Sequence, residues 1–295
     1  MYSEISKELT EDIVAAYNVK QQGKIVLQAV YSLPTNNDAQ PDLILAERGI
    51  LREAKMRGQL QPAEFLTGDL IPPECKDEDS HWFGIFYDPV VFLVNQQFSR
   101  NFGQHNLTTW NDLNKQSNIR VVMENLSDND STKNFLGSFA SRLGENEAFS
   151  YLKTLNKHIQ QYAKFPFTPV RMVAVGDADV AVTRISYVFK YLESDFPAYI
   201  VHPEDGAPIN LYCIGIYASS AKTTAAKDFL AWLIASNELQ RTLQKNFNGY
   251  MSVFPRGIEN SATDVKKMWI NKEYQTGSAK EELVAKWIES IRFSK

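Results

Sequence analysis

Two long apolar segments limit the folds open to this chain more than any other feature of its sequence. Trp82–Asn95 reads WFGIFYDPVVFLVN and is interrupted by Pro89, which cannot donate a hydrogen bond within a sheet. We therefore predict two strand pieces there, with a crossing between two parts of the molecule near Asp88. The second apolar segment, Asn210–Tyr217, predicts another strand with a second crossing near Asn210.

These two crossings predict two lobes. The first lobe is expected to be discontinuous and to comprise residues 1–88 and 210–295, and the second lobe to be inserted as residues 89–209. The chain has 295 residues, which is enough for two domains of about 150 residues each. It contains no apolar run approaching the ~18 residues that a membrane-spanning helix needs.

Helix and strand patterns alternate along the chain, as is typical of α/β proteins. Ser6 and Thr10 are both candidates for the cap of the first helix. The predicted helices are 6–18, 47–58, 110–113, 132–143, 147–155, 168–175, 187–193, 221–235, 237–246 and most of 262–291. The further predicted strands are 24–31, 41–46, 119–123, 180–183 and 198–202. We therefore expect an α/β fold in which helices flank a mostly parallel sheet in each lobe.

Composition and missing motifs exclude several classes of protein. The net charge is −4 and the basic residues are scattered, so nucleic-acid binding is not expected. The phosphate loop GxxxxGK, the patterns GxGxxG and GxSxG, and the zinc motif HExxH are all absent, so we expect a non-enzymatic protein without a cofactor. The residues before the first predicted helix show no signal peptide. Whether Cys75 and Cys213 form a disulfide is left open by the sequence.

Seven segments, in order along nearly the whole chain, carry a resemblance to a known family. They are VVFLVNQQF at 90–98, LTTWNDL at 107–113, residues 131–162, VAVGDADVAV at 173–182, HPEDGAP at 202–208, residues 214–240 and NGYMSVFPR at 248–256. Together they resemble the extracellular solute-binding proteins of ABC importers with the type 2 periplasmic-binding fold, near the ferric-ion, polyamine and phosphonate or sugar-phosphate receptors. The resemblance implies two lobes joined by two hinge strands, with a ligand held between the lobes.

The same resemblance implies the partners and the location. A receptor of this kind is a monomer that delivers a small ligand to ABC permease subunits, in the periplasm or anchored at the cell surface. A sensory ligand-binding module of a signalling system is the alternative from another class. The family normally has a signal peptide and an apolar strand before the Tyr-Ser loop, and here Met1 stands where that strand ends. Either the native chain begins earlier or this chain lacks a central strand. We expect the first, because the loss of a central parallel strand would open the core.

Small polar ligands in α/β proteins bind at the carboxyl ends of strands and at helix N-termini, where free N–H groups favour anions. This rule and the two crossings select the candidate ligand-binding residues Ser3, Glu47, Tyr87, Ser127, Ser131, Thr132, Arg184, Ser186, Tyr187 and Asn210. A guanidinium suits carboxylate or phosphate, so Arg184 beside hydroxyls at a helix N-terminus predicts an anionic ligand. A surface position or a structural ion pair is the alternative for Arg184.

Ferric-ion binding is the alternative ligand class. The ferric relatives carry two adjacent tyrosines at the positions that here read Ser186 and Tyr187, so one phenolate is missing. Glu47 resembles a glutamate that some of them use, and Ser6 stands where they often have a histidine. Glu47 and Tyr187 are therefore the metal ligands expected if iron is bound, and simple ferric binding is the second reading.

Overall fold

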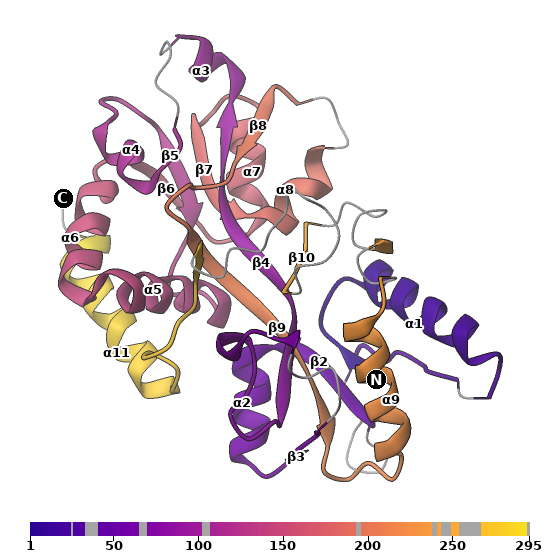
Figure 1. The fold of residues 1–295 in the computed structure, drawn as a ribbon. Coiled ribbons are helices and arrows are strands. Elements are labelled where there is room, and N and C mark those ends of the chain that lie inside the picture. The colour runs from indigo at the N-terminus through magenta and orange to yellow at the C-terminus, as the bar shows by residue number, and fades with distance from the viewer. Residues whose placement is uncertain are drawn as a thin grey trace. The chain divides into compact units, whose positions relative to one another are not determined.

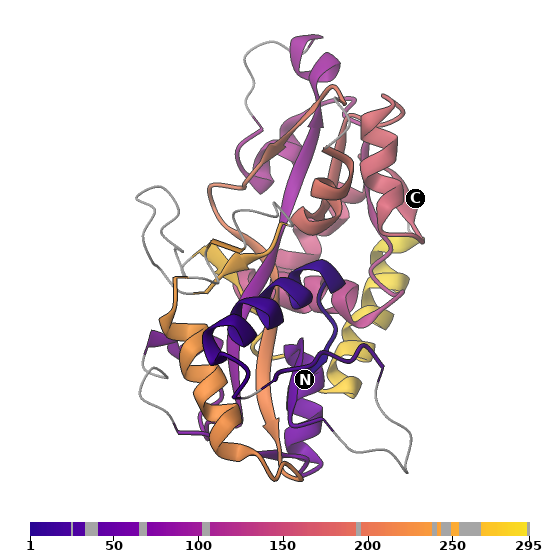
Figure 2. The same ribbon diagram turned by 90° about the vertical axis from the view of Figure 1, so that its right-hand side faces the viewer.

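A computed structural model shows the fold (Figure 1, Figure 2). The structure describes residues 1–24, 26–32, 41–64, 70–101, 107–192, 196–237, 241–242, 249–253 and 267–293. Most of the predicted helix 237–246 and the first residues of the predicted helical tail lie outside the described residues. Within the described part of the tail, residues 268–269 form a strand and a helix begins at Gly277.

The chain divides into two compact units. Unit 1 comprises Met1–Tyr87 and Leu211–Thr263, and unit 2 comprises Asp88–Asn210 and Asp264–Lys295. The chain passes from one unit to the other within strands β4 and β9, and it returns to unit 2 before the described tail residues 267–293. The prediction that the whole C-terminal tail belongs to the first lobe is wrong, because its described residues 267–293 belong to unit 2.

Among its described residues, unit 1 contains short strands and three longer helices. Its elements are β1 (Tyr2–Ser3), α1 (Lys7–Gln21), β2 (Leu43–Glu47), α2 (Arg48–Met56), β3 (Leu60–Gln61), a 3-10 turn (Pro73–Cys75), the first part of β4 (Trp82–Asn95), the second part of β9 (Ala207–Tyr217), α9 (Thr223–Ala235) and β10 (Met251–Ser252). Strand β2 pairs in parallel with β1 and antiparallel with β9, while β3 pairs antiparallel with β9 and β10 with β4. Cys75 and Cys213 are buried free thiols.

The predicted strand 24–31 is wrong for its described residues, 24 and 26–31, except at Val30, which forms a bridge with Tyr2. The N–H of Val30 donates to the carbonyl of Met1 at 2.9 Å, and the N–H of Ser3 donates to the carbonyl of Val30 at 3.0 Å. Earlier in the segment, the side chain of Asn18 binds both backbone groups of Leu27, at 2.7 and 2.9 Å. A side chain therefore satisfies the backbone there instead of a neighbouring strand.

Unit 2 contains most of the helices. Its elements are the second part of β4, α3 (Gln96–Asn101), α4 (Trp110–Lys115), β5 (Val121–Glu124), α5 (Asp130–Leu143), α6 (Glu145–Asn156), β6 (Ile159–Ala163), α7 (Phe167–Ala174), β7 (Val180–Arg184), α8 (Ile185–Leu192), β8 (Ala198–Val201), the first part of β9, β11 (Met268–Trp269), α11 (Gly277–Trp287) and a π-helical turn (Ile288–Arg292). Strand β5 pairs in parallel with β6 and β7, and β4 pairs antiparallel with β7 and β8. The expected α/β class is confirmed, but the sheets are mixed rather than mostly parallel, because β4 and β9 run against most of the strands they pair with.

Strand β4 is one uninterrupted strand, so the prediction of two strand pieces around Pro89 is wrong. Its residues Phe86 and Tyr87 pair with β10, and residues 90–94 pair with β7. Pro89 lies between these two ladders, so its missing N–H removes a hydrogen bond from neither. The boundary between the units falls at the same place, after Tyr87.

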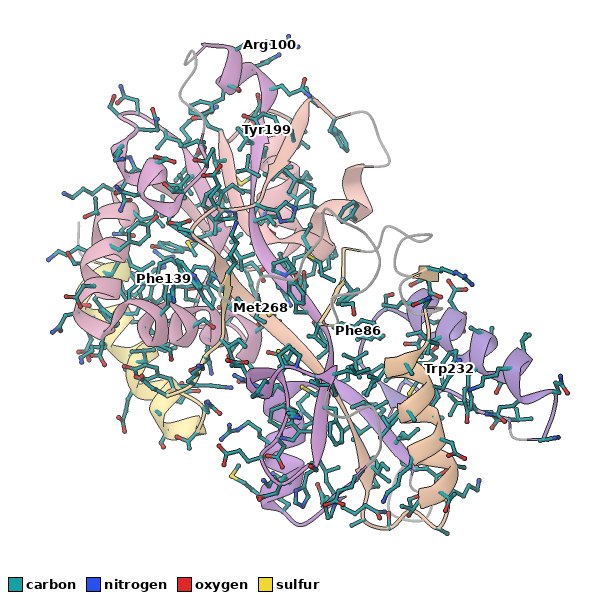
Figure 3. The ribbon with its side chains drawn as sticks, viewed as in Figure 1. Phe86, Arg100, Phe139, Tyr199, Trp232 and Met268 are labelled. Atoms are coloured by element: carbon teal, nitrogen blue, oxygen red, sulfur yellow. The ribbon has the colours of Figure 1, made fainter. Side chains whose placement is uncertain are left out.

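An aromatic cluster explains why the C-terminal tail belongs to unit 2. Phe139 of α5 (Figure 3) meets Trp110 edge-on with ring centroids 4.8 Å apart and Trp269 of β11 at 5.0 Å. Helix α11 lies beside α5 (Figure 1), and its Trp287 is fully buried in the same core. Removing these large aromatic surfaces from water holds the tail on unit 2.

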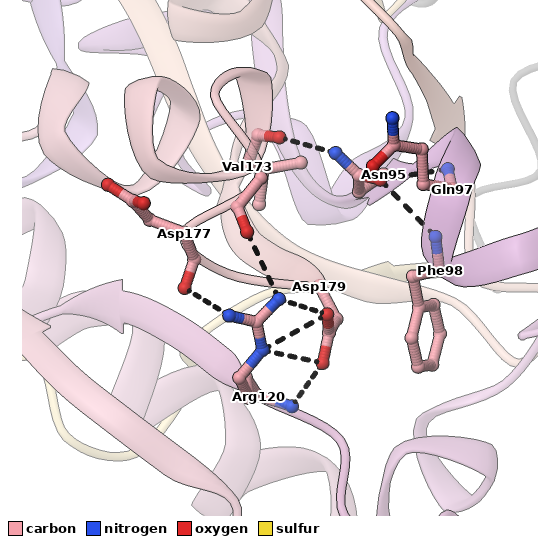
Figure 4. Close-up of polar contacts among 8 residues, drawn as sticks. Asn95, Gln97, Phe98, Arg120, Val173, Asp177 and Asp179 are labelled. Atoms are coloured by element: carbon pink, nitrogen blue, oxygen red, sulfur yellow. Dashed lines mark hydrogen bonds and ion pairs between the residues drawn. The ribbon is translucent and has the colours of Figure 1, made fainter. Parts of the chain in front are cut away.

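Polar contacts pin the beginning of β7 to its neighbours (Figure 4). The backbone N–H of Arg120 donates to Asp179 at 2.8 Å, and its guanidinium donates to the same carboxylate at 2.7 Å and to the carbonyl of Asp177 at 2.9 Å. At the end of β4, the side chain of Asn95 donates to the carbonyl of Val173 at 2.9 Å. These contacts fix how β7 is aligned with β5, so that the carboxyl ends of both strands lie at the same edge of the sheet.

Candidate functional site

The carboxyl ends of β5 and β7 meet at one edge of the sheet of unit 2. The two strands are parallel neighbours with Met123 opposite Val182, so the register places Glu124 across from Thr183, the residue before Arg184. Strand β4 runs the other way, with Val90 opposite Arg184, and brings Asp88 to the same edge. Three charged side chains from three strands therefore converge there.

Arg184 lies in the middle of this group, and its side chain is largely buried. Its Nε is 3.9 Å from Oε1 of Glu124, and its Nη1 donates to Oγ of Ser131 at 3.4 Å. Its guanidinium carbon lies 4.2 Å from the ring centroid of Tyr187, a cation–π contact. Tyr187 in turn meets Phe167 edge-on at 5.0 Å, so an aromatic pair supports one face of the arginine.

Asp88 is fully buried and is held by Ser186 at the start of α8. The backbone N–H of Ser186 donates to Oδ1 of Asp88 at 3.1 Å, and its hydroxyl donates to Oδ2 at 2.6 Å. Burial raises the pKa of Asp88, while the charge of Arg184 and the two bonds from Ser186 act to lower it. The two hydrogen bonds from Ser186 thus stabilise the ionised form of Asp88.

Glu124 has a different environment. Burial raises the pKa of its carboxyl, Arg184 acts to lower it, and the charges of Asp88 and Asp128 raise it further. The Glu124 side chain is only 10% exposed. Two buried carboxyls, those of Glu124 and Asp88, thus share one guanidinium.

A cavity of about 30 Å³ lies beside these groups and is lined entirely by residues of unit 2. Its polar lining includes Glu124, Ser131, Thr183, Arg184 and Asn210. Among the described residues, Oγ1 of Thr183 and Nδ2 of Asn210 are buried without a hydrogen-bond partner. Buried polar atoms are normally paired, so these two atoms mark a place where a polar group from outside can bind.

The size of this cavity limits what it can hold. A single water needs roughly 10–15 Å³ on this scale, so the cavity has room for about two waters or one small polar group. The Oδ1 of Asn210 accepts a bond from Nδ2 of Asn134 at 3.3 Å, which turns the amide nitrogen of Asn210 away from Asn134. The geometry is that of a subsite for one charged or polar group of a solute.

Comparison with known proteins identifies the family. The profile described as "Bacterial extracellular solute-binding protein" matches residues 38–276. The chain belongs to this family. It is therefore a solute-binding protein, and its fold agrees with that of solved periplasmic binding proteins.

Individual relatives are distant. A Haemophilus influenzae protein described as uncharacterised is 28% identical over 166 residues, which are 54% of this chain and 48% of that protein. This chain thus spans about half the length of the curated relative it matches.

Solved structures are similar over almost the whole chain. The periplasmic binding protein AfuA of Actinobacillus pleuropneumoniae, with exogenous fructose-6-phosphate bound, is 20% identical with a TM-score of 0.72, covering 99% of this chain and 98% of that one. Ferric iron-binding protein A of Mannheimia haemolytica, in an open conformation, is 17% identical with a TM-score of 0.79, covering 98% and 96%. At these identities the likeness shows the fold of this solute-binding protein and not its ligand.

Six of the ten predicted site residues belong to the edge of the sheet described above. Ser131, Thr132, Arg184 and Asn210 line the cavity. The hydroxyl of Thr132 donates to the carbonyl of Asn129 at 2.9 Å, so it also serves in the cap of α5. Ser186 and Tyr187 are positioned against Asp88 and Arg184 instead of lining the cavity. A seventh residue of unit 2, Ser127, is half-buried in the turn before α5 and does not line the cavity either.

The other three predicted residues belong to unit 1. Ser3 is buried and its hydroxyl lies 2.7 Å from that of Thr10. Glu47 ends β2 and stands at the N-cap of α2, where its side chain makes no capping bond. Tyr87 is in β4 and only 7% exposed. Their contact with a ligand stays a prediction.

Three residues of the site are not among the ten selected candidates. Asp88 and Thr183 lie in the crossing and the strand end that the sequence pointed to but were not selected, and Glu124 was missed. The rule that selected Arg184, a polar residue at the carboxyl end of a strand, applies equally to Glu124 at the end of β5. Thr183 immediately precedes Arg184, but whether its side chain faces the cavity depends on the pairing of β7 with β4 and β5. Asp88 was placed at a crossing, yet its partner Ser186 is 98 residues away.

Two further features of this solute-binding protein do not form the site. A larger cavity of about 710 Å³ lies in unit 1 against α1 and α9, and no predicted site residue lines it. Within the described residues, one cluster could ligate a metal: Asp77, Asp79 and His81. Lys55 binds both aspartates at 2.8 Å and so already neutralises much of their charge. None of the described helices combines the length and apolar character needed to cross a bilayer.

Proposed function

We propose that this solute-binding protein captures a small polar solute through a negatively charged group of that solute and delivers it to ABC permease subunits. The observation that carries the anion preference is the cavity at the end of β7. The guanidinium of Arg184 lines it together with the unpartnered Oγ1 of Thr183 and Nδ2 of Asn210. A cation and an amide donor around a space for one small group suit a carboxylate, phosphate or sulfate group.

The start of α5 adds to this preference. Helix α5 begins at Asp130, and Ser131 in its first turn both lines the cavity and accepts a bond from Arg184. The N-terminal end of a helix carries partial positive charge, which favours an anion nearby. The AfuA structure has a sugar phosphate bound, which is consistent with this class of solute.

Ferric ion remains the second candidate, since iron-binding proteins are among the structural neighbours. Against it, Tyr187, the one tyrosine at the expected pair of positions, stacks under the guanidinium of Arg184 at 4.2 Å. A guanidinium so close to that phenol would repel a trivalent cation bound there. The remaining parts of the proposal are a monomeric, non-enzymatic receptor that works in the periplasm or at the cell surface, with a sensory module as the alternative role.

Thermal denaturation with a panel of solutes tests the ligand class. The panel contains sodium sulfate, sugar phosphates, organic carboxylates and ferric citrate. A solute present at a hundredfold excess over its Kd stabilises the folded protein by about 2.7 kcal/mol, which raises the melting temperature by several degrees. We expect anionic solutes to do so. A shift with ferric salts and none with the anions would refute the anion preference.

Variants of Arg184 test the site itself. Arg184→Gln should remove the shift caused by the anion, Arg184→Lys should retain part of it, and Arg171→Gln, on the exposed surface of α7, should leave it intact. An unchanged anion-induced shift in folded Arg184→Gln would show that the solute binds elsewhere.

A further inference from the structure

The charge balance around Arg184 has a consequence for any anion that binds there. One guanidinium faces two buried carboxyls, those of Glu124 and Asp88. An anionic solute group in the cavity would be a third negative charge around a single positive one. In surroundings that water reaches poorly, such an excess of negative charge is costly, and it is relieved when one carboxyl binds a proton.

The structure distinguishes the two carboxyls. Asp88 accepts two hydrogen bonds from Ser186, which stabilise its ionised form, and it does not line the cavity. Glu124 does line the cavity. Within the described chain its one ion-pair partner is Arg184, at 3.9 Å, which is too long for a hydrogen bond. Glu124 is therefore the carboxyl that can take up the proton at the least cost.

We propose that Glu124 binds a proton when an anionic solute group binds beside Arg184, so that Glu124 sets both the pH dependence and the chemical selectivity of capture. This inference rests on the proposed anion site. The proton comes from solvent and no bond other than O–H is formed. Once protonated, Glu124 becomes a donor that can bind an oxygen of the solute.

The selectivity follows from that donor. The protonated Glu124, the guanidinium of Arg184 and the amide nitrogen of Asn210 together present donors from three strands to one small space. This set matches a group with several acceptor oxygens, such as phosphate or sulfate, better than a group with only one. A halide or another anion without hydrogen-bond geometry should bind weakly.

The other charged groups near Glu124 favour the same outcome. Asp88 on β4 and Asp128 in the turn before α5 both raise its pKa. The charged residues of the first turn of α5 are engaged with α11, in the pairs Asp130 with Lys280 and Lys133 with Glu281. Among the described residues, Arg184 is thus the cation that opposes protonation of Glu124, and a bound anion weakens that opposition by competing for the guanidinium.

Calorimetric titration with sulfate is the decisive experiment, because sulfate keeps its charge between about pH 5 and pH 8, so that any pH dependence of its binding comes from groups of the protein. Titrations in two buffers with different heats of ionisation count the protons taken up on binding. For the unaltered protein we expect close to one proton per sulfate at neutral pH, and an affinity that falls by up to about tenfold for each pH unit above the pKa of Glu124.

Two variants complete the test. Glu124→Gln should take up no proton, should bind sulfate with an affinity that does not change with pH, and should bind it more tightly than the unaltered protein at about pH 8. Glu147→Gln, at an exposed position of α6, should behave like the unaltered protein. The proton count on the unaltered protein does not depend on whether Glu124→Gln folds well.

The possible failures are distinguishable. Sulfate binding without proton uptake, at an affinity independent of pH, would overturn the role of Glu124 and leave the anion receptor standing. Absence of sulfate binding at every pH from about 5 to 8 would overturn both this inference and the anion preference on which it rests. Proton uptake that persists in Glu124→Gln would assign the proton to another group.

Discussion

Replacing Gly137 by alanine tests how the C-terminal tail is held on unit 2. Gly137 lies inside α5, and a Cβ atom there would lie 2.4 Å from Nδ2 and 2.7 Å from Cγ of Asn271. Asn271 is buried, and its amide donates to the carbonyl of Tyr274 at 2.6 Å and accepts from the N–H of Tyr274 at 3.0 Å. The amide group cannot move away without losing these bonds.

The magnitude follows from three opposing effects. Alanine is favoured over glycine inside a helix by about 1 kcal/mol. Displacing Asn271 removes two hydrogen bonds, each contributing about 1 kcal/mol, and the crowding costs at least about 1 kcal/mol more. We therefore expect Gly137→Ala to lower the free energy of unfolding by about 2 kcal/mol, although the substitution improves the intrinsic helix propensity.

Urea unfolding followed by tryptophan fluorescence measures this change through the midpoint and slope of the transition. Gly277→Ala at the start of α11 is the matched control, because no heavy atom lies within 4 Å of the added Cβ there. It should leave stability unchanged or slightly raised. The double variant Gly137→Ala/Asn271→Ala should lose less unfolding free energy than the two single variants lose together, because Asn271→Ala removes the side chain that the new Cβ would clash with. A midpoint for Gly137→Ala at or above that of Gly277→Ala would refute the reasoning.

Two further substitutions probe the site and the first helix. Ser186→Ala removes the 2.6 Å bond to the buried carboxylate of Asp88 and should cost about 1.5–3 kcal/mol in urea unfolding, whereas Ser150→Ala on the exposed face of α6 should cost little. Burial holds the pKa of Asp88 above its unfolded value, and Ser186→Ala raises this pKa further because it removes a donor to the ionised carboxylate. The loss in free energy of unfolding should therefore grow as pH rises above about 4. An equal loss at acid and neutral pH would contradict a charged Asp88. Ser6→Ala removes the acceptor for the N–H of Leu9, 3.3 Å away, and should cost about 1 kcal/mol; an unchanged midpoint would show that α1 is capped in another way.

Elements with strong local signals were predicted well. Helix α1 begins after Ser6, one of the two proposed caps, and β7 and α9 fall within a few residues of their predicted ranges. Helix α5 begins two residues earlier than predicted, because Asn129 and not a later residue supplies its capping box with Thr132. Strand β6 and the two-residue strands were missed, since a short or half-exposed strand carries little apolar pattern of its own.

Elements whose structure depends on a distant partner were not predictable in this way. Residues 24–31 carry an apolar pattern typical of a strand, yet the side chain of Asn18 takes the backbone groups of Leu27. The tail was assigned to the first lobe by its position in the chain, whereas Trp269 and Trp287 pack in the core of unit 2. Neither outcome follows from local propensity, because both are decided by which surfaces meet after folding.

The sequence by itself determined the α/β class, the membership of the solute-binding family and the polar residues at the end of β7, since these depend on local pattern and on order along the chain. Only the tertiary structure decided which of those residues meet. Arg184 lies beside Glu124, which is far from it in sequence, because parallel pairing brings the carboxyl ends of β5 and β7 together. Asp88 joins them because β4 runs antiparallel to β7. Charge balance at a buried site is a property of strands far apart in sequence, so the competition of two carboxyls for one guanidinium could be read only from the fold.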